Sequence, residues 1–524
     1  LLALLSSLLA LAFGARWILG EKRLAWRWRI AAAAIAIVSM ALAFFARTRP
    51  SLSLTCLAAI PASVLIFARA VSKSDSVARA KSVDLWHTIV EHPARLFAAT
   101  FLALIAAGSF FLALPVCASR GEALEFVDAA FTAVSATCVT GLSVVDTATA
   151  FSATGQAAIL VLIQLGGLGV MTFYAAGLVL LGRRLALKQE AAMADMLGRE
   201  DRRELGRALA QVLVTTFAFE LLGALALAGL FRLDGAPFGT AMWRGAFTAV
   251  SAFCNAGFAL STDNLVSFNR EPLVLHIVAS LIVAGGLGPM VIASLPSLVR
   301  RNRAPLQAKI ALSMTAILLI SGATLFCALE WRGALAGLPV TDRLHNAIFQ
   351  SVTARTAGFN SVDLTAIGPA TVTAMVVLMF IGGRPGSTAG GIKTTTAALL
   401  VAAVRAALRG RPEVSLFGRH VPHFAVYKAA AIASLYAGAA IAGVLVLEVT
   451  QKMDPQTAVF EVVSALGTVG LTIGGTAQLD GVGEIAIMVC MFLGRVGPLT
   501  MFMILAGRRE ETRVRLPEED VSLG

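Results

Sequence analysis

Four copies of one short pattern are spaced along this chain of 524 residues. Each copy passes from an apolar segment into a run rich in Ser, Thr and Gly, and each contains a glycine followed by a bulky apolar residue. The copies read FTAVSATCVTGLS from Phe131, FTAVSAFCNAGFA from Phe247, FQSVTARTAGFNS from Phe349 and FEVVSALGTVGLT from Phe460. The phenylalanine lies ten residues before this glycine in three copies and nine residues before it in the third. Such recurrence indicates a fold assembled from duplicated units.

A second glycine-rich signal follows each copy at a nearly constant distance. These signals read QLGGLGVM from Gln164, AGGLGPM from Ala284, IGGRPGS from Ile381 and LGRVGPL from Leu493. The separation between the two glycines is 25, 28, 24 and 24 residues in the four copies. Taken alone, paired glycines in membrane helices favour close helix packing. Their recurrence with the first signal favours a duplicated membrane transport fold.

Hydrophobicity places the chain in a membrane. Hydrophobic residues make up 57% of it, charged residues only 14%, and its mean hydropathy is +0.80. About twenty apolar residues are needed to cross a bilayer as a helix, and eleven such runs are found. They begin near Leu1, Ile30, Leu52, Leu96, Ala157, Leu209, Leu273, Ile310, Thr371, Ala425 and Glu484. The four short patterns lie between runs and are too short to cross, so we expect them to enter the membrane and return.

These observations predict an all-α polytopic membrane protein with four membrane-pore-membrane repeats around a pseudo-fourfold pore. The predicted units are extra N-terminal transmembrane helices in residues 1–90, repeats in 91–182, 183–299, 300–405 and 406–507, and a cytoplasmic tail in 508–524. A net charge of +12 does not indicate nucleic acid, because 29 of the 43 Lys and Arg residues fall on one side of this topology. By the positive-inside rule that side is cytoplasmic. We therefore expect a multi-pass protein in the lipid of the inner (plasma) membrane, with its pore segments entering from outside.

The short segments suit cation passage. A cation that leaves water needs oxygen ligands, and backbone carbonyls supply them without adding net charge. Glycine permits the backbone angles that such a loop requires. The candidate filter residues are Thr137, Cys138, Val139, Thr140 and Gly141; Cys254, Asn255, Ala256 and Gly257; Arg355, Thr356, Ala357 and Gly358; and Thr468, Val469 and Gly470. We expect K+ to contact Thr137, Val139, Gly141, Gly257, Gly358 and Gly470.

Acidic residues follow three of the filter glycines. Asp146, Asp263 and Asp363 lie five, six and five residues after them, and the fourth repeat has no acid at that distance. We expect these carboxylates to concentrate cations at the outer mouth.

Three of these stretches carry a family resemblance. SATCVTGLSVVDT from Ser135, SVTARTAGFNSVD from Ser351 and IGGRPGSTAGGIKTTT from Ile381 resemble the Trk/Ktr/HKT superfamily of potassium transporters, and look closest to its bacterial KtrB/TrkH membrane subunits. The resemblance covers about residues 90 to 507. It implies passage of K+ or Na+, filter glycines at the four positions above, a homodimer, and regulation by a separate cytoplasmic nucleotide-binding subunit of the TrkA/KtrA type. Arg384 and the three N-terminal spans depart from the family pattern.

A gate is expected between Gly382 and Thr396. Residues 382–391 contain five glycines and a proline, so a continuous helix is not expected there. By resemblance, this interrupted helix and the basic residue Arg495 form the gate. Basic charge at this depth opposes cations unless it is paired. The candidate gate residues are Gly382, Gly383, Gly386, Ser387, Thr388, Gly390, Gly391, Lys393 and Arg495.

Three other features stay open at this level. Glu220 in an apolar run suits either an ion or proton ligand or a partnered polar residue between helices. His420 and His423 suit either a metal site or a polar loop. The segment from Arg183 to Leu205 suits either partner binding or a solvated cytoplasmic helix.

The prediction is a potassium-translocating subunit that conducts down the electrochemical gradient, with Na+ as a possible second substrate. No Walker motif is found, so a nucleotide would act only through the regulatory partner. An alternating-access cation symporter is the alternative, although the repeats here are four and parallel instead of inverted. A polytopic membrane enzyme would need clustered His, Asp or Glu at a membrane face, and the sequence has none.

Overall fold

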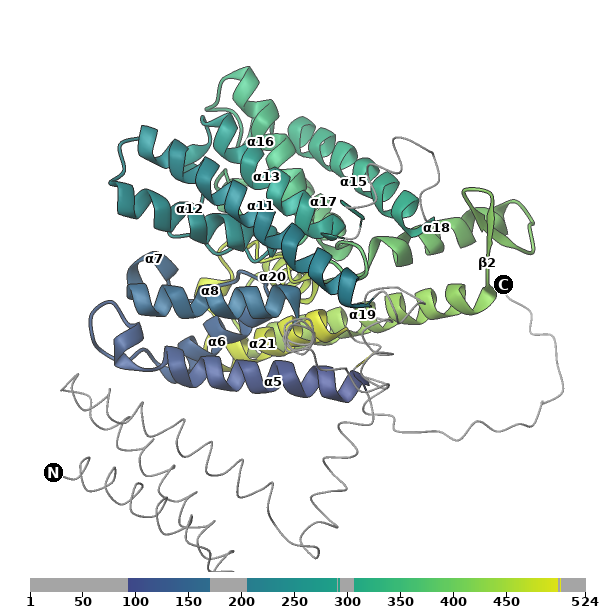
Figure 1. Ribbon diagram of the computed structural model, residues 1–524. Coiled ribbons are helices and arrows are strands. Elements are labelled where there is room, and N and C mark those ends of the chain that lie inside the picture. Colours follow the sequence, from purple (N-terminus) through teal and green to yellow (C-terminus); the bar gives the residue numbers. More distant parts are fainter. Residues whose placement is uncertain (1–92, 170–204, 290, 293–305, 498–499, 501–524) are drawn as a thin grey trace, which may run out of the picture.

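The computed structural model describes residues 93–169, 205–289, 291–292, 306–497 and 500 (Figure 1). The predicted N-terminal helices in 1–90, the segment from Arg183 to residue 204, and the tail 508–524 lie outside the described residues, as do the predicted repeat boundaries at 182/183 and 299/300. The limits of the repeats therefore stay a prediction.

The described chain runs four times through the same order of a long helix, a pore helix and a second helix. The long first helices are α5 (Pro93–Leu112), α11 (Leu205–Leu233), α15 (Leu306–Glu330) and α19 (His423–Thr450). The pore helices are α6 (Phe126–Thr137), α12 (Phe238–Phe253), α16 (Val340–Thr353) and α20 (Pro455–Gly467). The second helices are α8 (Ala153–Leu168), α13 (Pro272–Leu287), α17 (Pro369–Phe380) and α21 (Gly481–Val496).

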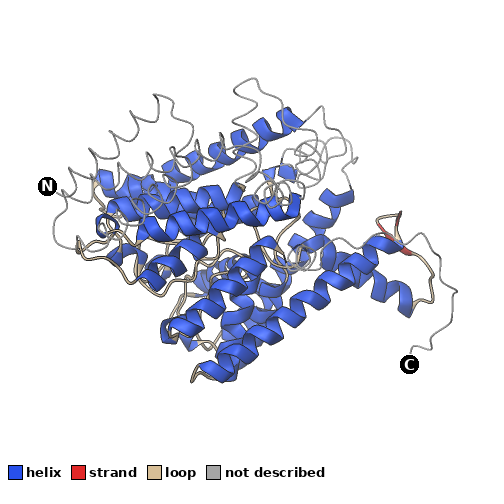
Figure 2. Cartoon of the chain, turned by 90° about the horizontal axis from the view of Figure 1, so that it is seen from below, coloured by secondary structure: helices blue, strands red, loops and turns tan. Residues whose placement is uncertain are grey.

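Short elements complete the repeats. They are η1 (Pro115–Cys117), α7 (Thr147–Ala150), η3 (Val266–Phe268), η4 (Leu364–Ala366) and η5 (Thr476–Gln478). After the third repeat, α18 (Thr394–Leu408) leads through a two-stranded antiparallel hairpin, β1 (Val414–Leu416) and β2 (Arg419–Val421), into α19. Figure 2 shows this hairpin at one end of an otherwise helical described chain.

The four repeats close into a ring. Helix α8 of the first repeat packs against α12 of the second, α13 against α16 of the third, α17 against α20 of the fourth, and α21 against α6 of the first. A hydrophobic cluster fills each of these junctions. A ring of this kind is what parallel duplicated units form around one axis.

The recurring phenylalanine and the apolar residue after the glycine both pack in these junctions. Phe131 and Leu142 share the cluster between the fourth and first repeats, and Phe247 and Phe258 share the one between the first and second. Phe349 with Phe359, and Phe460 with Leu471, occupy the other two clusters. All four phenylalanines are almost fully buried. The sequence pattern therefore arises from packing between the repeats. Burial of the aromatic side chains stabilises these junctions.

The outer faces suit lipid. Three described helices are long and apolar enough to cross a membrane: Leu209–Leu233, Leu306–Glu330 and His423–Thr450. Large apolar side chains such as Leu222 and Ile320 are exposed on them, which is the pattern of helices whose solvent is hydrocarbon. The second helices are shorter, because α8, α13 and α21 end at Gly169, Gly288 and Gly497, each with positive φ.

Candidate ion filter and intramembrane loop

Each pore helix ends in a segment with the same unusual backbone. Two residues before the filter glycine, Val139, Asn255, Thr356 and Thr468 have φ of 50°, 58°, 69° and 49°. The glycines Gly141, Gly257, Gly358 and Gly470 have φ of 97°, 72°, 79° and 90°. Positive φ is rare outside glycine and is strained for β-branched residues. Four copies of the same strained geometry at equivalent positions indicate a built functional feature.

The four segments meet in one closed ring. A Cβ atom built on Gly141 would lie 2.5 Å from the carbonyl oxygen of Ala256, and one on Gly257 would lie 2.7 Å from that of Ala357. One on Gly358 would lie 2.5 Å from the carbonyl oxygen of Val469. One on Gly470 would overlap the carbonyl oxygen of Thr140, which completes the circuit. No side chain fits at any of the four glycines.

The ring brings together carbonyls from four distant parts of the chain. The oxygens that abut the glycines belong to the preceding residues, Thr140, Ala256, Ala357 and Val469. All four belong to the candidate filter residues expected from the sequence, although the K+ contacts expected at this level were assigned to the filter glycines. Rings of neutral carbonyls suit a monovalent cation that has shed water.

Side chains of the candidate filter residues point into the protein in two cases. The thiol of Cys254 lies 3.9 Å from Glu220 Oε1 and 3.7 Å from Gln164 Oε1. Arg355 is 8% exposed and donates from Nη2 to the carbonyl oxygen of Gly382 at 3.3 Å. Both side chains are therefore engaged in contacts within the protein.

The acidic residues after the filter act as helix and turn caps. Asp146 accepts a hydrogen bond from the backbone N–H of Ala148 at the start of α7, and Asp363 accepts from that of Thr365 at the start of η4. Asp263 accepts from the backbone N–H of Ser267 in η3. The carboxylate oxygens are thus engaged locally, which our expectation of a cation-concentrating mouth did not include.

In the fourth repeat a residue of the pore helix replaces the missing cap. Glu461 of α20 is fully buried and accepts hydrogen bonds from the hydroxyls of Thr472 and Thr476, both at 2.5 Å. It also accepts from the backbone N–H groups of Ile473 (3.3 Å) and Gly475 (3.1 Å). Four donors on one carboxylate fix the chain that follows the fourth filter. Sequence reasoning missed Glu461, although the absent acid in that repeat was a signal for it.

The second helix of the third repeat is interrupted as expected. Residues 381–393 form an irregular segment, hereafter the 381–393 loop, between α17 and α18. Its two ends are tied together, because the N–H of Gly382 donates to the oxygen of Ile392 at 2.8 Å and the N–H of Thr394 donates to that of Gly383 at 3.0 Å. Helix α18 begins at Thr394, so the irregular part ends a little before the expected Thr396.

This loop contacts the second and fourth repeats close to the ends of their pore helices. The hydroxyl of Thr388 donates to the carbonyl oxygen of Phe253, the last residue of pore helix α12, at 3.2 Å. The N–H of Arg384 donates to the oxygen of Gly286 at 3.3 Å. A Cβ on Gly390 would overlap the side chain of Thr468 in the fourth filter segment. The loop therefore sits directly next to the end of the ring at which the pore helices stop and the filter segments begin.

Arg495 joins three repeats. From α21 its guanidinium donates to the carbonyl oxygens of Thr388 in the loop and of Gly166 and Gly167 at the end of α8, the last at 3.0 Å. Lys393 donates to the oxygen of Ala389 at 2.6 Å. Neither side chain contacts a carboxylate among the described residues. The two expected basic residues are thus paired with backbone carbonyls, which also need donors when buried.

The downstream glycines serve close packing. A Cβ on Gly166, Gly285 or Gly494 would overlap the carbonyl oxygen of Thr137, Phe253 or Leu466, at or next to the end of a pore helix. In the third repeat Gly382 instead meets the oxygen of Gly390 within the loop. The packing interpretation of these glycines is therefore correct in three repeats, and the third repeat uses the same position to close its loop.

Two of the polar features that the sequence left open have partners nearby. Glu220 of α11 accepts from Gln164 Nε2 at 3.1 Å, so it is a partnered residue between helices. His420 lies 3.4 Å from Glu413 at the hairpin, and the described residues hold no group of three or more His, Cys, Asp or Glu side chains that suits a metal.

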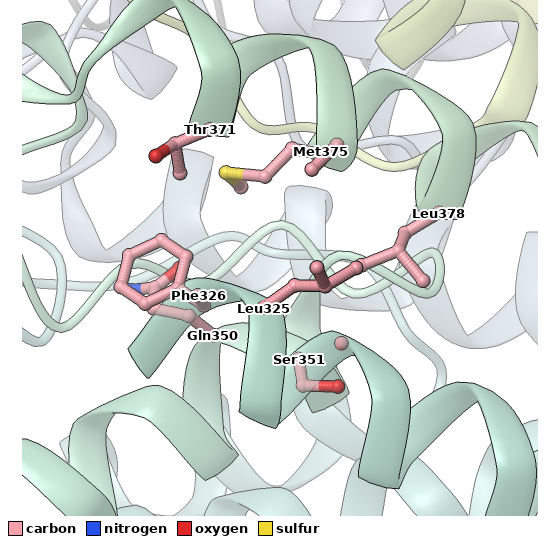
Figure 3. A pocket seen from close by; sticks show the side chains of 9 residues that line it. Leu325, Phe326, Gln350, Ser351, Thr371, Met375 and Leu378 are labelled. Carbon is pink, nitrogen blue, oxygen red and sulfur yellow. The ribbon is translucent and has the colours of Figure 1, made fainter. Parts of the chain in front are cut away.

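A small cavity lies behind the third pore helix (Figure 3). It is lined by Gln350 and Ser351 of α16, Phe326 of α15, and Thr371 and Met375 of α17. Its volume of about 10 Å³ suits one water molecule, and Gln350 Oε1 has no partner among the described residues. This space is separate from the ring.

Comparison with known proteins decides the family. Residues 90–511 match the family model TrkH, described as a cation transport protein. The chain belongs to the TrkH family of cation transport proteins. It is 37% identical to the potassium/sodium uptake protein NtpJ of Enterococcus hirae, over 82% of this chain and 97% of that one. It is 38% identical to the Ktr system potassium uptake protein B of Vibrio alginolyticus, over 82% and 94%.

A solved structure shows the fold independently. The potassium transporter TrkH from Vibrio parahaemolyticus matches with a TM-score of 0.65 at 16% identity, covering 96% of this chain and 97% of that one. The family resemblance and the all-α polytopic fold class are confirmed. This TrkH family member is a multi-pass inner-membrane transporter and not an enzyme.

Proposed function

We propose that this TrkH family member takes up K+, and to a lesser degree Na+, through a filter of backbone carbonyls. The observation that carries the proposal is the closed ring in which each filter glycine abuts the carbonyl oxygen of the next repeat. The named activities of relatives at 37–38% identity, potassium uptake and potassium/sodium uptake, agree with it.

The transported ion loses water at the ring and gains carbonyl oxygens instead. The ligands carry no net charge, so the ion is bound weakly enough to leave. A single cation moving inward gains about 2.3 kcal/mol per 100 mV of negative-inside potential. Transport by this route requires no nucleotide hydrolysis in the chain.

The 381–393 loop and Arg495 form the gate in this proposal. The loop lies below the ring, and Arg495 holds it to α8 and α21 through the carbonyl oxygens of Thr388, Gly166 and Gly167. Opening requires these hydrogen bonds to break or shift together. A positive guanidinium beside the path also opposes a cation until it moves.

A homodimer and a cytoplasmic nucleotide-binding subunit of the TrkA/KtrA type complete the proposal. Both follow from the family resemblance. Size-exclusion chromatography with light scattering of the purified chain tests the first, and nucleotide-dependent co-purification with such a subunit tests the second.

The central test is transport by the purified protein in liposomes with an inside-negative potential. We expect accumulation of labelled K+ that exceeds that of Na+ and that needs no second substrate. Gly358→Ser is expected to abolish the preference, and Gly438→Ser is the matched control because a Cβ there meets nothing within 4 Å. Transport that requires a co-substrate would favour the alternating-access symporter, and equal effects of the two substitutions would refute the filter.

A further inference from the structure

The first and fourth filters share a contact with their pore helices. Ser135 of α6 and Ser464 of α20 each lie six residues before the filter glycine. The hydroxyl oxygen of Ser135 accepts from the N–H of Gly141 at 3.0 Å, and that of Ser464 accepts from the N–H of Gly470 at 3.1 Å. Both serines are fully buried. The same residue type performs the same task in two repeats that adjoin in the ring.

The contact bears directly on the ring carbonyls. The N–H of Gly141 and the C=O of Thr140 belong to one peptide group, and in a trans peptide these two bonds point in opposite directions. A serine that holds the N–H toward the pore helix therefore turns the C=O away from it. The oxygens so directed, those of Thr140 and Val469, are two of the four that abut glycines in the ring.

The second and third repeats lack this contact among the described residues. Ser251 occupies the equivalent position in the second repeat, but its buried hydroxyl has no hydrogen-bond partner. The third repeat has Val352 there, and its neighbour Ser351 donates instead to the oxygen of Leu319 on α15 at 2.8 Å. The filter of the third repeat also starts differently, since the N–H of Ala357 bonds to Thr353 whereas its counterparts bond to Ser135, Ser251 and Ser464.

The serine of the fourth repeat is fixed from both sides. Ser464 also donates to the carbonyl oxygen of Leu471, just after the filter glycine, at 2.6 Å. A hydroxyl that both accepts and donates has its rotation fixed. It therefore holds the peptide group that precedes the filter glycine and the one that follows Leu471.

From this pattern, and resting on the proposed filter, we infer that Ser135 and Ser464 are positioning residues that set the ring carbonyls for K+ against Na+. They do so by orienting the peptide groups of the first and fourth filters. Serine hydroxyls accordingly fix the filter segments of the first and fourth repeats, whereas those of the second and third repeats lack this hydrogen bond among the described residues.

Three alanine substitutions test the inference with an internal control. Ser135→Ala and Ser464→Ala each remove a hydrogen bond to a filter glycine, whereas Ser251→Ala removes a buried hydroxyl that has no partner. Loss of one such bond corresponds to about a fivefold change in an equilibrium ratio. We expect the ratio of K+ to Na+ transport to fall about fivefold in the first two variants and to stay within about twofold in the third.

Two further measurements separate positioning from general stability. Thermal unfolding of each variant is recorded beside the transport ratio, because a merely structural serine would lower stability without changing the ratio. Ser464→Thr keeps the hydroxyl and is expected to retain selectivity that Ser464→Ala loses. Equal selectivity of all three alanine variants and the parent protein would overturn the inference. If Gly358→Ser still destroyed selectivity in that case, the filter itself would stand, and only the role of the serines would be lost.

Discussion

The filter ring, formed by the contacts of Gly141, Gly257, Gly358 and Gly470, and the 381–393 loop are both rich in glycine. Their glycines differ in what they contact. In the ring, each glycine abuts the backbone of another repeat, so the close contacts join four repeats into one closed structure. In the loop, Gly382 meets Gly390 of the same loop, whereas Gly390 itself meets the side chain of Thr468 in the fourth repeat. The loop is thus packed both within itself and against other repeats, but its glycine contacts do not form a closed circuit.

The two regions therefore differ in the free-energy cost of moving them. Moving one filter segment disturbs both neighbours in the ring, because no space exists for a shift. Moving the loop as a unit requires the loss of its hydrogen bonds to the second repeat and to Arg495, and of the contact between Gly390 and Thr468. Elements held by few contacts are those that rearrange at low free-energy cost.

The largest effect is expected from shortening the 381–393 loop. Deletion of Gly386 to Gly390 removes the contacts of Thr388 while α17 and α18 remain. We expect K+ flux to rise at least about tenfold, since tenfold in rate needs only about 1.4 kcal/mol from the barrier. Flux is compared in liposomes after gel filtration shows a monodisperse protein. A folded variant with unaltered or lower flux would return the segment to the role of a packing kink.

Two substitutions of Arg495 separate the effect of its positive charge from that of its hydrogen bonds to three backbone carbonyl oxygens. Arg495→Ala removes both, and we expect roughly a threefold to tenfold rise in flux because a positive charge beside the path is lost. Arg495→Lys keeps the charge but cannot donate from a fork to three carbonyl oxygens. If charge alone closes the path, the lysine variant conducts like the parent. If bridging closes it, the lysine variant conducts like the alanine variant.

A loss of thermal stability in Arg495→Ala without a gain in flux would contradict a gating role. That outcome would show that the guanidinium serves only to satisfy buried carbonyl oxygens.

The filter ring is supported in part by Glu461, which binds the chain that follows the fourth filter. Glu461→Gln keeps the shape of the side chain but weakens four hydrogen bonds to the segment after the fourth filter. We expect about 1–3 kcal/mol of lost stability, the cost of leaving buried polar groups imperfectly hydrogen-bonded. Thermal unfolding in detergent measures it. An unchanged midpoint would show that the ring does not depend on this support.

The smallest expected effect concerns the caps. Asp363→Ala removes a cap and is expected to cost about 1 kcal/mol, whereas Asp363→Asn retains an acceptor and is expected to cost less. Neither change should alter the apparent K+ affinity if the carboxylate serves only as a cap. A weaker affinity for K+ in Asp363→Asn, largest at low ionic strength, would support the cation-concentrating role expected from the sequence.

Much of the fold was readable from the sequence because it depends on local patterns. The phenylalanines and filter glycines recur, and each proves to lie at the junction of two repeats. The interruption after Ile381 was also readable, because five glycines and a proline preclude a helix. The left-handed residues were not readable, since Val139, Asn255, Thr356 and Thr468 share no chemistry that predicts positive φ.

The partners of Arg495 were beyond sequence reasoning for a different reason. Gly166 and Thr388 are far from it in the chain, and they contact it through backbone carbonyls, which every residue carries. The aspartates Asp146, Asp263 and Asp363 were recognised as a recurring set, but their capping contacts were not foreseen. Their spacing from the glycines was informative, whereas the direction of their side chains required the structure.

The central claim is that four segments form one selective ring, and bi-ionic reversal potentials test it most directly. The protein is placed in a planar bilayer with K+ on one side and Na+ on the other, and Gly141, Gly257, Gly358 and Gly470 are each replaced by Ser. The account predicts that every one of the four variants shifts the reversal potential toward zero, because each added side chain displaces a carbonyl of the next repeat. Four folded variants that all retain the K+ preference of the parent protein would contradict it.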